Sequence, residues 1–352
     1  MTRVPIRPNV KSIPLYVPGQ RAAQPMAYKL SSNEAPFPPL PGVLAAVADA
    51  AAELNRYPNA VASQLARALA EHHQVEANQI VIGAGSLGVL ASLVAAFAGP
   101  GDQIIYPWRS FEAYPLLAAV AAVEAVQVPL AATGHLDLAA MAQAVTPASR
   151  LILLCSPNNP TGPSVEAEEF ASFMEQVPPE VLVVVDNAYT EYVTNPAAVQ
   201  PLELVEQYSN LVVVRTFSKA YGLAGMRVGY AIGQPRLIAA IQATTYPFSV
   251  SSLSQMAALV SLGLQDQMIQ RVAATVEVRQ QLWEGLVEQG WLVPPSDGNF
   301  VWLPAGQQAV PLGRALCAAG LTTRPFDGDG VRITTAEPET VPLILDVTRS
   351  WV

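Results

Sequence analysis

Three continuous apolar segments, evenly spaced along the chain, constrain its fold more than any other feature of the sequence. They begin at residues 151, 181 and 211 and read LILLC, VLVVV and LVVV. None alternates polar with apolar residues, which is typical of strands buried on both faces of a parallel sheet. Their spacing of about 30 residues matches one strand–helix–strand unit. The sequence therefore predicts an α/β protein with a mostly parallel sheet flanked by helices.

Weaker apolar segments extend this pattern on both sides. Together they predict a large domain over residues 40–245, and the pattern changes after that point to long helices separated by short strands. A smaller α+β domain is therefore predicted over residues 246–352. The proline-rich residues 1–39 are predicted to form an extended arm that belongs to the small domain. The further strands are expected at 79–82, 103–106, 227–231, 300–303 and 331–334, and the helices at 165–176, 253–264, 267–289 and 312–319.

Charge and residue usage exclude several classes of function. The 352 residues carry a net charge of −9, which argues against a nucleic acid or an anionic membrane as partner. No apolar run has the length of a membrane span, and the first residues lack the apolar core of a signal peptide. The two cysteines and three histidines show no metal-ligand spacing. We therefore expect a cytoplasmic protein without a metal site.

Polar residues follow each of the three apolar segments. Asn158 and Asn159 come after the first, Asp186 and Tyr189 after the second, and Lys219 after the third. Ligands of open parallel sheets bind at the carboxyl ends of the strands. The sequence therefore predicts one crevice that receives an amide, a carboxylate, a phenol and an ammonium group.

The segment GAGSLG, residues 83–88, is the most specific phosphate-binding signal in the chain. It follows a predicted strand and opens a predicted helix, as a dinucleotide-binding loop does. The acidic residue that such a loop needs at the end of the next strand is absent, because that strand ends in Tyr106-Pro107-Trp108. Two readings stay open here: a helix N-terminus that binds a single phosphate, and a tight turn without a ligand.

Lysine is rare, which draws attention to Lys219. Only three of the 19 basic residues are lysines. A desolvated lysine is suited to Schiff-base chemistry because its pKa falls and frees the amine. A carboxylate such as Asp186 could pair with a protonated pyridine nitrogen. Together with a phosphate-binding loop, these groups describe a pyridoxal-phosphate site, in which the cofactor ring is the electron sink.

Three ordered motifs then resemble a known family. They are CSPNNPTG at 155–162, DNAY at 186–189 and RTFSKAYGLAGMR at 215–227. They are similar to the signatures of fold-type I pyridoxal-phosphate aminotransferases, and within these to the histidinol-phosphate aminotransferase group. WRSFEAYP at 108–115 and TRPF at 323–326 resemble its aromatic, or phenylalanine, aminotransferase branch. Asn187 departs from the pattern, since the family usually has glutamate there.

The resemblance implies a role for each matching residue. Lys219 would carry the cofactor and move the substrate proton, while Asp186 would pair with the pyridine nitrogen. Tyr57 would reach the cofactor phosphate of a neighbouring subunit, which implies a homodimer. The other implied cofactor contacts are Asn159 and Tyr189 (phenolic oxygen), Ala84, Gly85, Ser86, Ser218 and Arg227 (phosphate) and Phe111 (ring stacking); the implied substrate contacts are Arg332, Tyr16, Arg324 and Asn33.

Several functions remain open at this point. The resemblance favours transfer of an amino group between phenylalanine or tyrosine and a 2-oxo acid such as 2-oxoglutarate. Histidinol phosphate is an alternative amino donor, and decarboxylation of an amino-acid phosphate is an alternative reaction. The glycine-rich loop alone would fit a nicotinamide-dependent dehydrogenase, and a noncatalytic binding protein could share the fold. Taken singly, Asp186 could cap a turn, Phe111 could be core, and Arg227 could form a structural ion pair.

Overall fold

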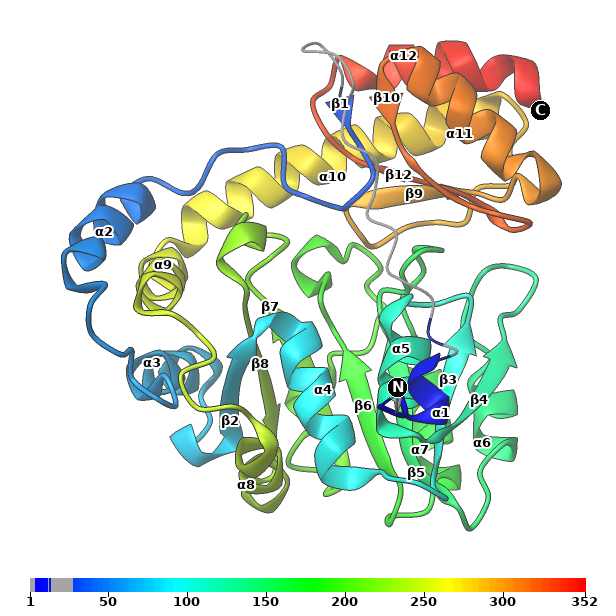
Figure 1. Cartoon of the computed structure of the whole chain (residues 1–352). Coiled ribbons are helices and arrows are strands. Elements are labelled where there is room, and N and C mark those ends of the chain that lie inside the picture. Colours follow the sequence, from blue (N-terminus) through cyan, green and yellow to red (C-terminus); the bar gives the residue numbers. More distant parts are fainter. Residues whose placement is uncertain (1–3, 12, 14–27) are drawn as a thin grey trace.

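A seven-stranded sheet forms the larger part of the computed structural model, which describes residues 4–11, 13 and 28–352 (Figure 1). Its strand order is β2-β8-β7-β6-β5-β3-β4. All neighbours are parallel except β8, which runs antiparallel to both β2 and β7. The predicted α/β class is thus confirmed. The strands are β2 (Ile80–Ala84), β3 (Gln103–Trp108), β4 (Glu124–Pro129), β5 (Ser149–Cys155), β6 (Leu182–Asp186), β7 (Leu211–Thr216) and β8 (Val228–Gly233).

The three apolar segments are the central strands β5, β6 and β7. Alternate side chains of these strands enter different cores: Leu154 and Val183 face one, whereas Leu153 and Val184 face the other. Both faces are covered by helices, so the central positions of these strands favour apolar residues. One face packs on α4 (Gly85–Phe97), α5 (Ala113–Ala121) and α8 (Pro235–Thr244); the other packs on α3 (Ser63–His73), α6 (Leu138–Gln143), α7 (Ala167–Gln176) and α9 (Ser252–Leu262).

A smaller layer lies over the carboxyl ends of these strands, at the top of Figure 1. Its antiparallel sheet has the order β11-β12-β9 and packs on a separate apolar core. The parallel pair β1 and β10 brings the N-terminal segment into this layer. The predicted domain boundaries stay a prediction. The elements are β1 (Tyr28–Lys29), β9 (Phe300–Leu303), β10 (Leu321–Thr322), β11 (Arg324–Phe326), β12 (Gly330–Thr334), α10 (Gln265–Glu288), α11 (Ala309–Ala318) and α12 (Thr340–Thr348).

Two features depart from the sequence-based expectation. The arm contains a helical turn, α1 (Pro8–Lys11), in which Pro8 holds the first position, where its missing N–H costs least. Asn9 anchors this turn by donating to the carbonyl of Ala119 on α5 at 2.7 Å. Strand β4 has no apolar run to predict it, because it lies at the sheet edge and is mostly exposed. The remaining helix is α2 (Val43–Ala50).

Candidate active site

A cleft opens where the carboxyl ends of β5, β6 and β7 meet the smaller layer. It is the position expected for a ligand in a parallel sheet. The cleft brings together most of the residues singled out in the sequence, although they are up to 300 positions apart. Those that line it are Asn33, Ser86, Phe111, Asn159, Asp186, Tyr189, Ser218, Lys219, Arg227, Arg324 and Arg332.

Asp186 is the last residue of β6 and is 3% exposed. The Tyr114 hydroxyl donates to its Oδ2 at 3.3 Å, whereas its buried Oδ1 has no hydrogen-bond partner among the described residues. Burial raises the pKa of this carboxyl to about 6, against the opposing effects of Tyr114 and Lys219. A buried carboxylate oxygen without a donor is costly. It is the group that a protonated pyridine nitrogen would satisfy.

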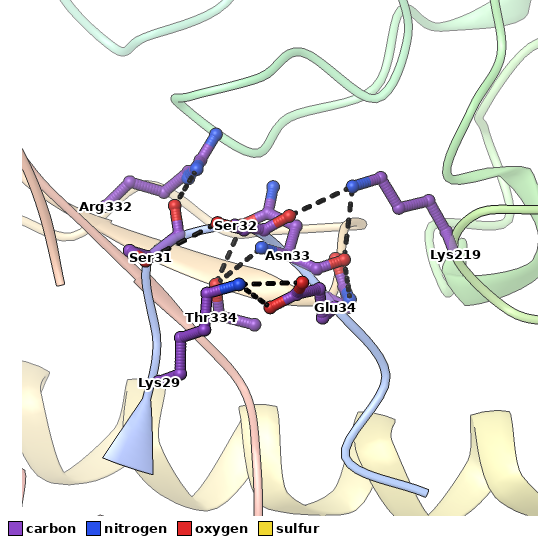
Figure 2. A network of polar contacts seen from close by, with 9 residues as sticks. Lys29, Ser31, Ser32, Asn33, Glu34, Lys219, Arg332 and Thr334 are labelled. Carbon is purple, nitrogen blue, oxygen red and sulfur yellow. Dashed lines mark hydrogen bonds and ion pairs between the residues drawn. The ribbon is translucent and has the colours of Figure 1, made fainter. Parts of the chain in front are cut away.

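Lys219 follows β7 and points across the cleft (Figure 2). Its Nζ donates to the backbone carbonyls of Ser32 at 3.2 Å and Asn33 at 3.1 Å. Burial, Arg332 and Arg227 lower the pKa of the amine, Glu34 and Asp186 raise it, and the net result is a pKa of about 7. A large share of the amine is therefore neutral near pH 7, as nucleophilic attack on an aldehyde requires.

Backbone amides and a guanidinium converge at the N-terminus of α4. Gly85 is the first residue of this helix and has φ +76°, a conformation that favours glycine. A Cβ at this position would overlap the guanidinium of Arg227, so the absence of a side chain allows the close approach. Arg227 also donates to the Ser218 hydroxyl at 3.3 Å. Helix N–H groups and a positive charge together suit a phosphate.

Two arginines reach the cleft from the smaller layer. Arg332 on β12 donates to Asn159 Oδ1 at 2.5 Å and to the carbonyl of Ser31 at 2.6 Å. Arg324 on β11 donates to both carboxylate oxygens of Glu112, at 3.0 and 3.1 Å. The contacts with Asn159 and Glu112 join strands of the smaller layer to loops of the large sheet across the cleft, while the Ser31 contact lies within the smaller layer and its arm.

Two predicted contacts besides Gly85 are described by the structure but do not line this cleft. Tyr57 is 84% exposed and packs on Phe248, with ring centroids 4.9 Å apart. Ala84 ends β2 and precedes the helix, so only its backbone could contribute. Tyr16 lies outside the described residues.

Sequence reasoning did not assign Tyr114 to the site, although its hydroxyl bonds to Asp186. It also missed the neighbours of Asn33 in the segment 31–34, which line the cleft and supply the Ser32 carbonyl that accepts from Lys219. Phe111 lies edge-to-face with Tyr114 at 5.7 Å, and its three-residue spacing from Tyr114 is the one sequence signal that links the two rings.

Asn187, which replaces the glutamate usual in the family, has a local structural role. Its Nδ2 donates to the Ser156 carbonyl at 2.7 Å, and its Oδ1 accepts from Arg215 at 3.4 Å. An amide can supply both of these contacts, whereas a carboxylate could only accept. The substitution thus fixes the backbone at the start of the loop that carries Asn159.

Within residues 4–11, 13 and 28–352, no group of three or more His, Cys, Asp or Glu side chains could hold a metal ion. No helix in the described part of the chain is long and apolar enough to cross a membrane.

Comparisons with known proteins agree with this geometry. Residues 26–341 match the family Aminotransferase class I and II. The chain is 45% identical to an aromatic amino acid aminotransferase of Thermobifida fusca and 46% identical to one of Streptomyces avermitilis, each over 98% of this chain and 97% of the relative. The solved histidinol-phosphate aminotransferase of Sinorhizobium meliloti, in complex with pyridoxal-5′-phosphate, superposes with a TM-score of 0.90 at 27% identity, covering 100% of this chain and 99% of that one.

The chain belongs to the class I and II aminotransferases. It is a pyridoxal-phosphate-dependent aminotransferase, which confirms the predicted cofactor and reaction class. The alternative of a nicotinamide-dependent dehydrogenase was wrong. The glycine-rich loop on which that alternative rested forms the turn from β2 into α4.

Proposed function

We propose that this aminotransferase transfers the amino group of an aromatic amino acid, phenylalanine or tyrosine, to a 2-oxo acid such as 2-oxoglutarate. The observation that carries the proposal is the name of its relatives: several, at 44–46% identity over nearly the whole chain, are called aromatic amino acid aminotransferases. The acceptor acid is inferred from the reaction class alone.

Each cleft residue has a role in this proposal. Asp186 Oδ1 accepts the pyridine N–H, and Asn159 and Tyr189 contact the phenolic oxygen. Bound pyridoxal phosphate supplies an electron sink that acidifies the substrate Cα–H. Lys219 Nζ takes that proton and returns it, which its lowered pKa favours. The remaining contacts are Ala84, Gly85, Ser86, Ser218 and Arg227 at the phosphate and Phe111 at the ring face.

The charges of the two arginines support a carboxylate substrate over a phosphate. Arg324 faces the carboxylate of Glu112, which offsets its charge. Arg332 is held by Asn159 and the Ser31 carbonyl, both neutral acceptors. A guanidinium matches a carboxylate with two parallel hydrogen bonds.

A half-reaction tests the choice of substrate. Purified enzyme with bound cofactor is mixed with phenylalanine, tyrosine or histidinol phosphate, and conversion of the cofactor to its amine form is followed by absorbance. We expect both aromatic amino acids to react faster. Histidinol phosphate reacting about tenfold faster, about 1.4 kcal/mol in barrier height, would overturn the proposal. Release of carbon dioxide without formation of an oxo acid would instead indicate the alternative decarboxylase.

The enzyme is further proposed to be a homodimer in which Tyr57 reaches the partner's cofactor phosphate. Aminotransferases of this family are generally dimeric. Tyr57 and Phe248, 84% and 46% exposed, form an exposed aromatic pair, and the nearby sequence positions Leu54 and Tyr246 are also exposed. Such patches are frequently interfaces between subunits. A phenol suits this role, because a rigid ring crosses an interface at low entropic cost.

A further inference from the structure

Asn33 was expected to bind substrate, but both ends of its side chain are engaged within the protein. Its Nδ2 donates to the Tyr189 phenol oxygen at 2.9 Å. Its Oδ1 accepts from the Thr334 hydroxyl at 2.9 Å, a contact drawn in Figure 2. The residue is 1% exposed. It therefore connects β12 of the smaller layer to the loop that follows β6 in the large sheet.

The backbone of Asn33 is fixed as firmly as its side chain. Its φ is +52°, in the left-handed region that asparagine tolerates better than most residues. Its N–H donates to Thr334 Oγ1 at 2.9 Å, and its carbonyl accepts from Asn299 at 3.2 Å and from Lys219 at 3.1 Å. The side-chain amide is thus held in one place relative to Tyr189.

Thr334 determines which end of the amide faces Tyr189. Its oxygen already accepts the Asn33 N–H, and its hydrogen needs an acceptor because the side chain is 1% exposed. Asn33 Oδ1 is that acceptor. If the amide were flipped, the Thr334 hydrogen would be left buried without a partner, at a cost of about 1–3 kcal/mol. The N–H end of the amide therefore faces the phenol.

This orientation has a consequence for Tyr189. Its oxygen accepts from Asn33, and no described residue accepts its hydroxyl hydrogen. If Asn33 presented Oδ1 instead, the phenol would donate to the amide and not to the cleft. We propose that Asn33 is a positioning residue, oriented by Thr334, which keeps the Tyr189 hydroxyl hydrogen available to the phenolic oxygen of the cofactor.

The same strand holds the second side chain assigned to that oxygen. Arg332 and Thr334 are two residues apart on β12, so their side chains share a face of the strand. Arg332 bonds to Asn159, and Thr334 acts through Asn33 on Tyr189. Strand β12 thus positions both proposed partners of the cofactor oxygen. The inference rests on the proposed contact between Tyr189 and the cofactor, and it is independent of the substrate.

The test measures the pH at which the absorbance of the bound cofactor changes. A hydroxyl that donates to the phenolic oxygen stabilises its negative charge and lowers the proton affinity of the conjugated group. Asn33→Asp keeps shape and backbone but makes the phenol donate to a carboxylate. Asn33→Gly keeps the left-handed backbone and removes both bonds. We expect the midpoint to rise by about one pH unit in Asn33→Asp and by about half a unit in Asn33→Gly.

Two further comparisons separate positioning from general damage. Thr334→Val should raise the midpoint as Asn33→Gly does, while Thr334→Ser, which keeps the hydroxyl, should restore the wild-type value. In a Tyr189→Phe background, Asn33→Gly should add no further shift, because its effect passes through the phenol. Only Asn33→Asp adds a charge beside Tyr189, so Asn33→Gly and Thr334→Val, which add none, decide the test. The charged and titratable groups that already face Tyr189 are Arg332, Asp186, Cys155 and Lys219.

Each other outcome overturns the inference. An unchanged midpoint in Asn33→Gly means that the amide does not act on the phenol. A shift that persists in full in the Tyr189→Phe background means that it acts by another route. If Tyr189→Phe alone leaves the midpoint unchanged, both the role of Asn33 and the proposed contact between Tyr189 and the phenolic oxygen of the cofactor are contradicted. The choice of amino donor is measured separately with the wild-type enzyme, so its failure is distinguishable.

Discussion

The hydroxyl of Tyr114 donates to one carboxylate oxygen of Asp186 and leaves the other without a donor among the described residues. Tyr114 lies on α5 and Asp186 is the last residue of β6, so the packing of α5 on the sheet sets the orientation of the Asp186 carboxylate. One oxygen is used to orient the group, and the other is available to the cofactor. The relationship explains why a buried, apparently structural tyrosine matters to the site.

Replacing Tyr114 by Phe should weaken cofactor binding without unfolding the protein. The variant loses one hydrogen bond to a carboxylate but keeps the ring contacts with Phe111 and Tyr106. We expect a loss of about 1 kcal/mol, or about fivefold in the dissociation constant of pyridoxal phosphate measured by fluorescence titration. Tyr106→Phe is the matched control, because its hydroxyl bonds to Gln127 instead. Equal effects of the two changes would contradict the role of Tyr114.

Asp186→Asn should stabilise the cofactor-free protein while impairing function. The pKa of Asp186 is raised to about 6 by burial, so the folded state disfavours its charged form. This loss of unfolding free energy is absent below about pH 4, the pKa of aspartate in the unfolded chain. It grows between about pH 4 and pH 6 and stays constant above pH 6. A neutral amide removes it, which gives a gain of about 3 kcal/mol at pH 8 and little at pH 4. Thermal unfolding of both proteins across this range measures the difference. A gain that does not depend on pH would exclude the charge as its cause.

Lys219 should react with an acylating reagent with an apparent pKa near 7 in the cofactor-free protein. Arg332 lowers this pKa and Glu34 raises it, so Arg332→Met should move the midpoint up and Glu34→Gln should move it down. Arg324→Met is the matched control, since Arg324 faces Glu112. Mass spectrometry measures the acylation of each lysine as a function of pH. The chain has only three lysines, and Lys11 serves as the internal reference. A midpoint near 10 would contradict the proposed desolvation.

Borohydride reduction of the loaded enzyme tests the attachment site itself. We expect the cofactor to become fixed to Lys219, which lines the cleft. Peptide mapping distinguishes this residue from Lys11 and Lys29. Label on either of these, or none, would remove Lys219 from its proposed role.

Gly85→Ala should cost more than backbone strain alone. The new Cβ would meet the Arg227 guanidinium, and φ is +76°. Gly101→Ala is the matched control, since Gly101 has φ +98° and open space around its Cβ. We expect both variants to lose about 1 kcal/mol of unfolding free energy from strain. Only Gly85→Ala should also lose cofactor affinity, measured by dialysis and absorbance. Similar affinities in the two variants would contradict a phosphate site at this helix end.

The central strands of the sheet could be predicted from the sequence because each one is marked by a short continuous segment of apolar residues. A strand buried on both faces needs an uninterrupted apolar run, and parallel pairing then brings successive strand ends to one edge. Cys155 pairs with Asp186, and Asp186 pairs with Val214, so the residues that follow each strand converge. The order of three motifs was therefore enough to indicate the cleft and its chemistry.

Contacts across the cleft could not be predicted in the same way. Asn33 and Tyr189 are 156 positions apart, and their hydrogen bond depends on how two layers pack. The family resemblance implied a substrate contact for Asn33, and nothing in the sequence around it indicates a bond to Tyr189. Tyr114 lies on an apolar helix face, so its hydroxyl gives no local signal. The edge strand β4 was missed because exposure removes the apolar pattern.

If Tyr57 of each subunit contacts the cofactor phosphate of the other subunit, mixed dimers of two inactive variants should recover activity. Lys219→Ala and Tyr57→Ala chains are each expected to be impaired, and they are combined under conditions that exchange subunits. If Tyr57 acts on the partner's site, one site of the hybrid carries both changes and the other carries neither, so activity rises above both parents. If Tyr57 acts within its own chain, each site carries one defect. Lys219→Ala mixed with Asp186→Ala is the matched control, because both side chains line the same chain's cleft and their hybrid should recover nothing. A demonstrably mixed dimer without recovery would therefore contradict the shared site while leaving the roles of Lys219 and Asp186 untouched.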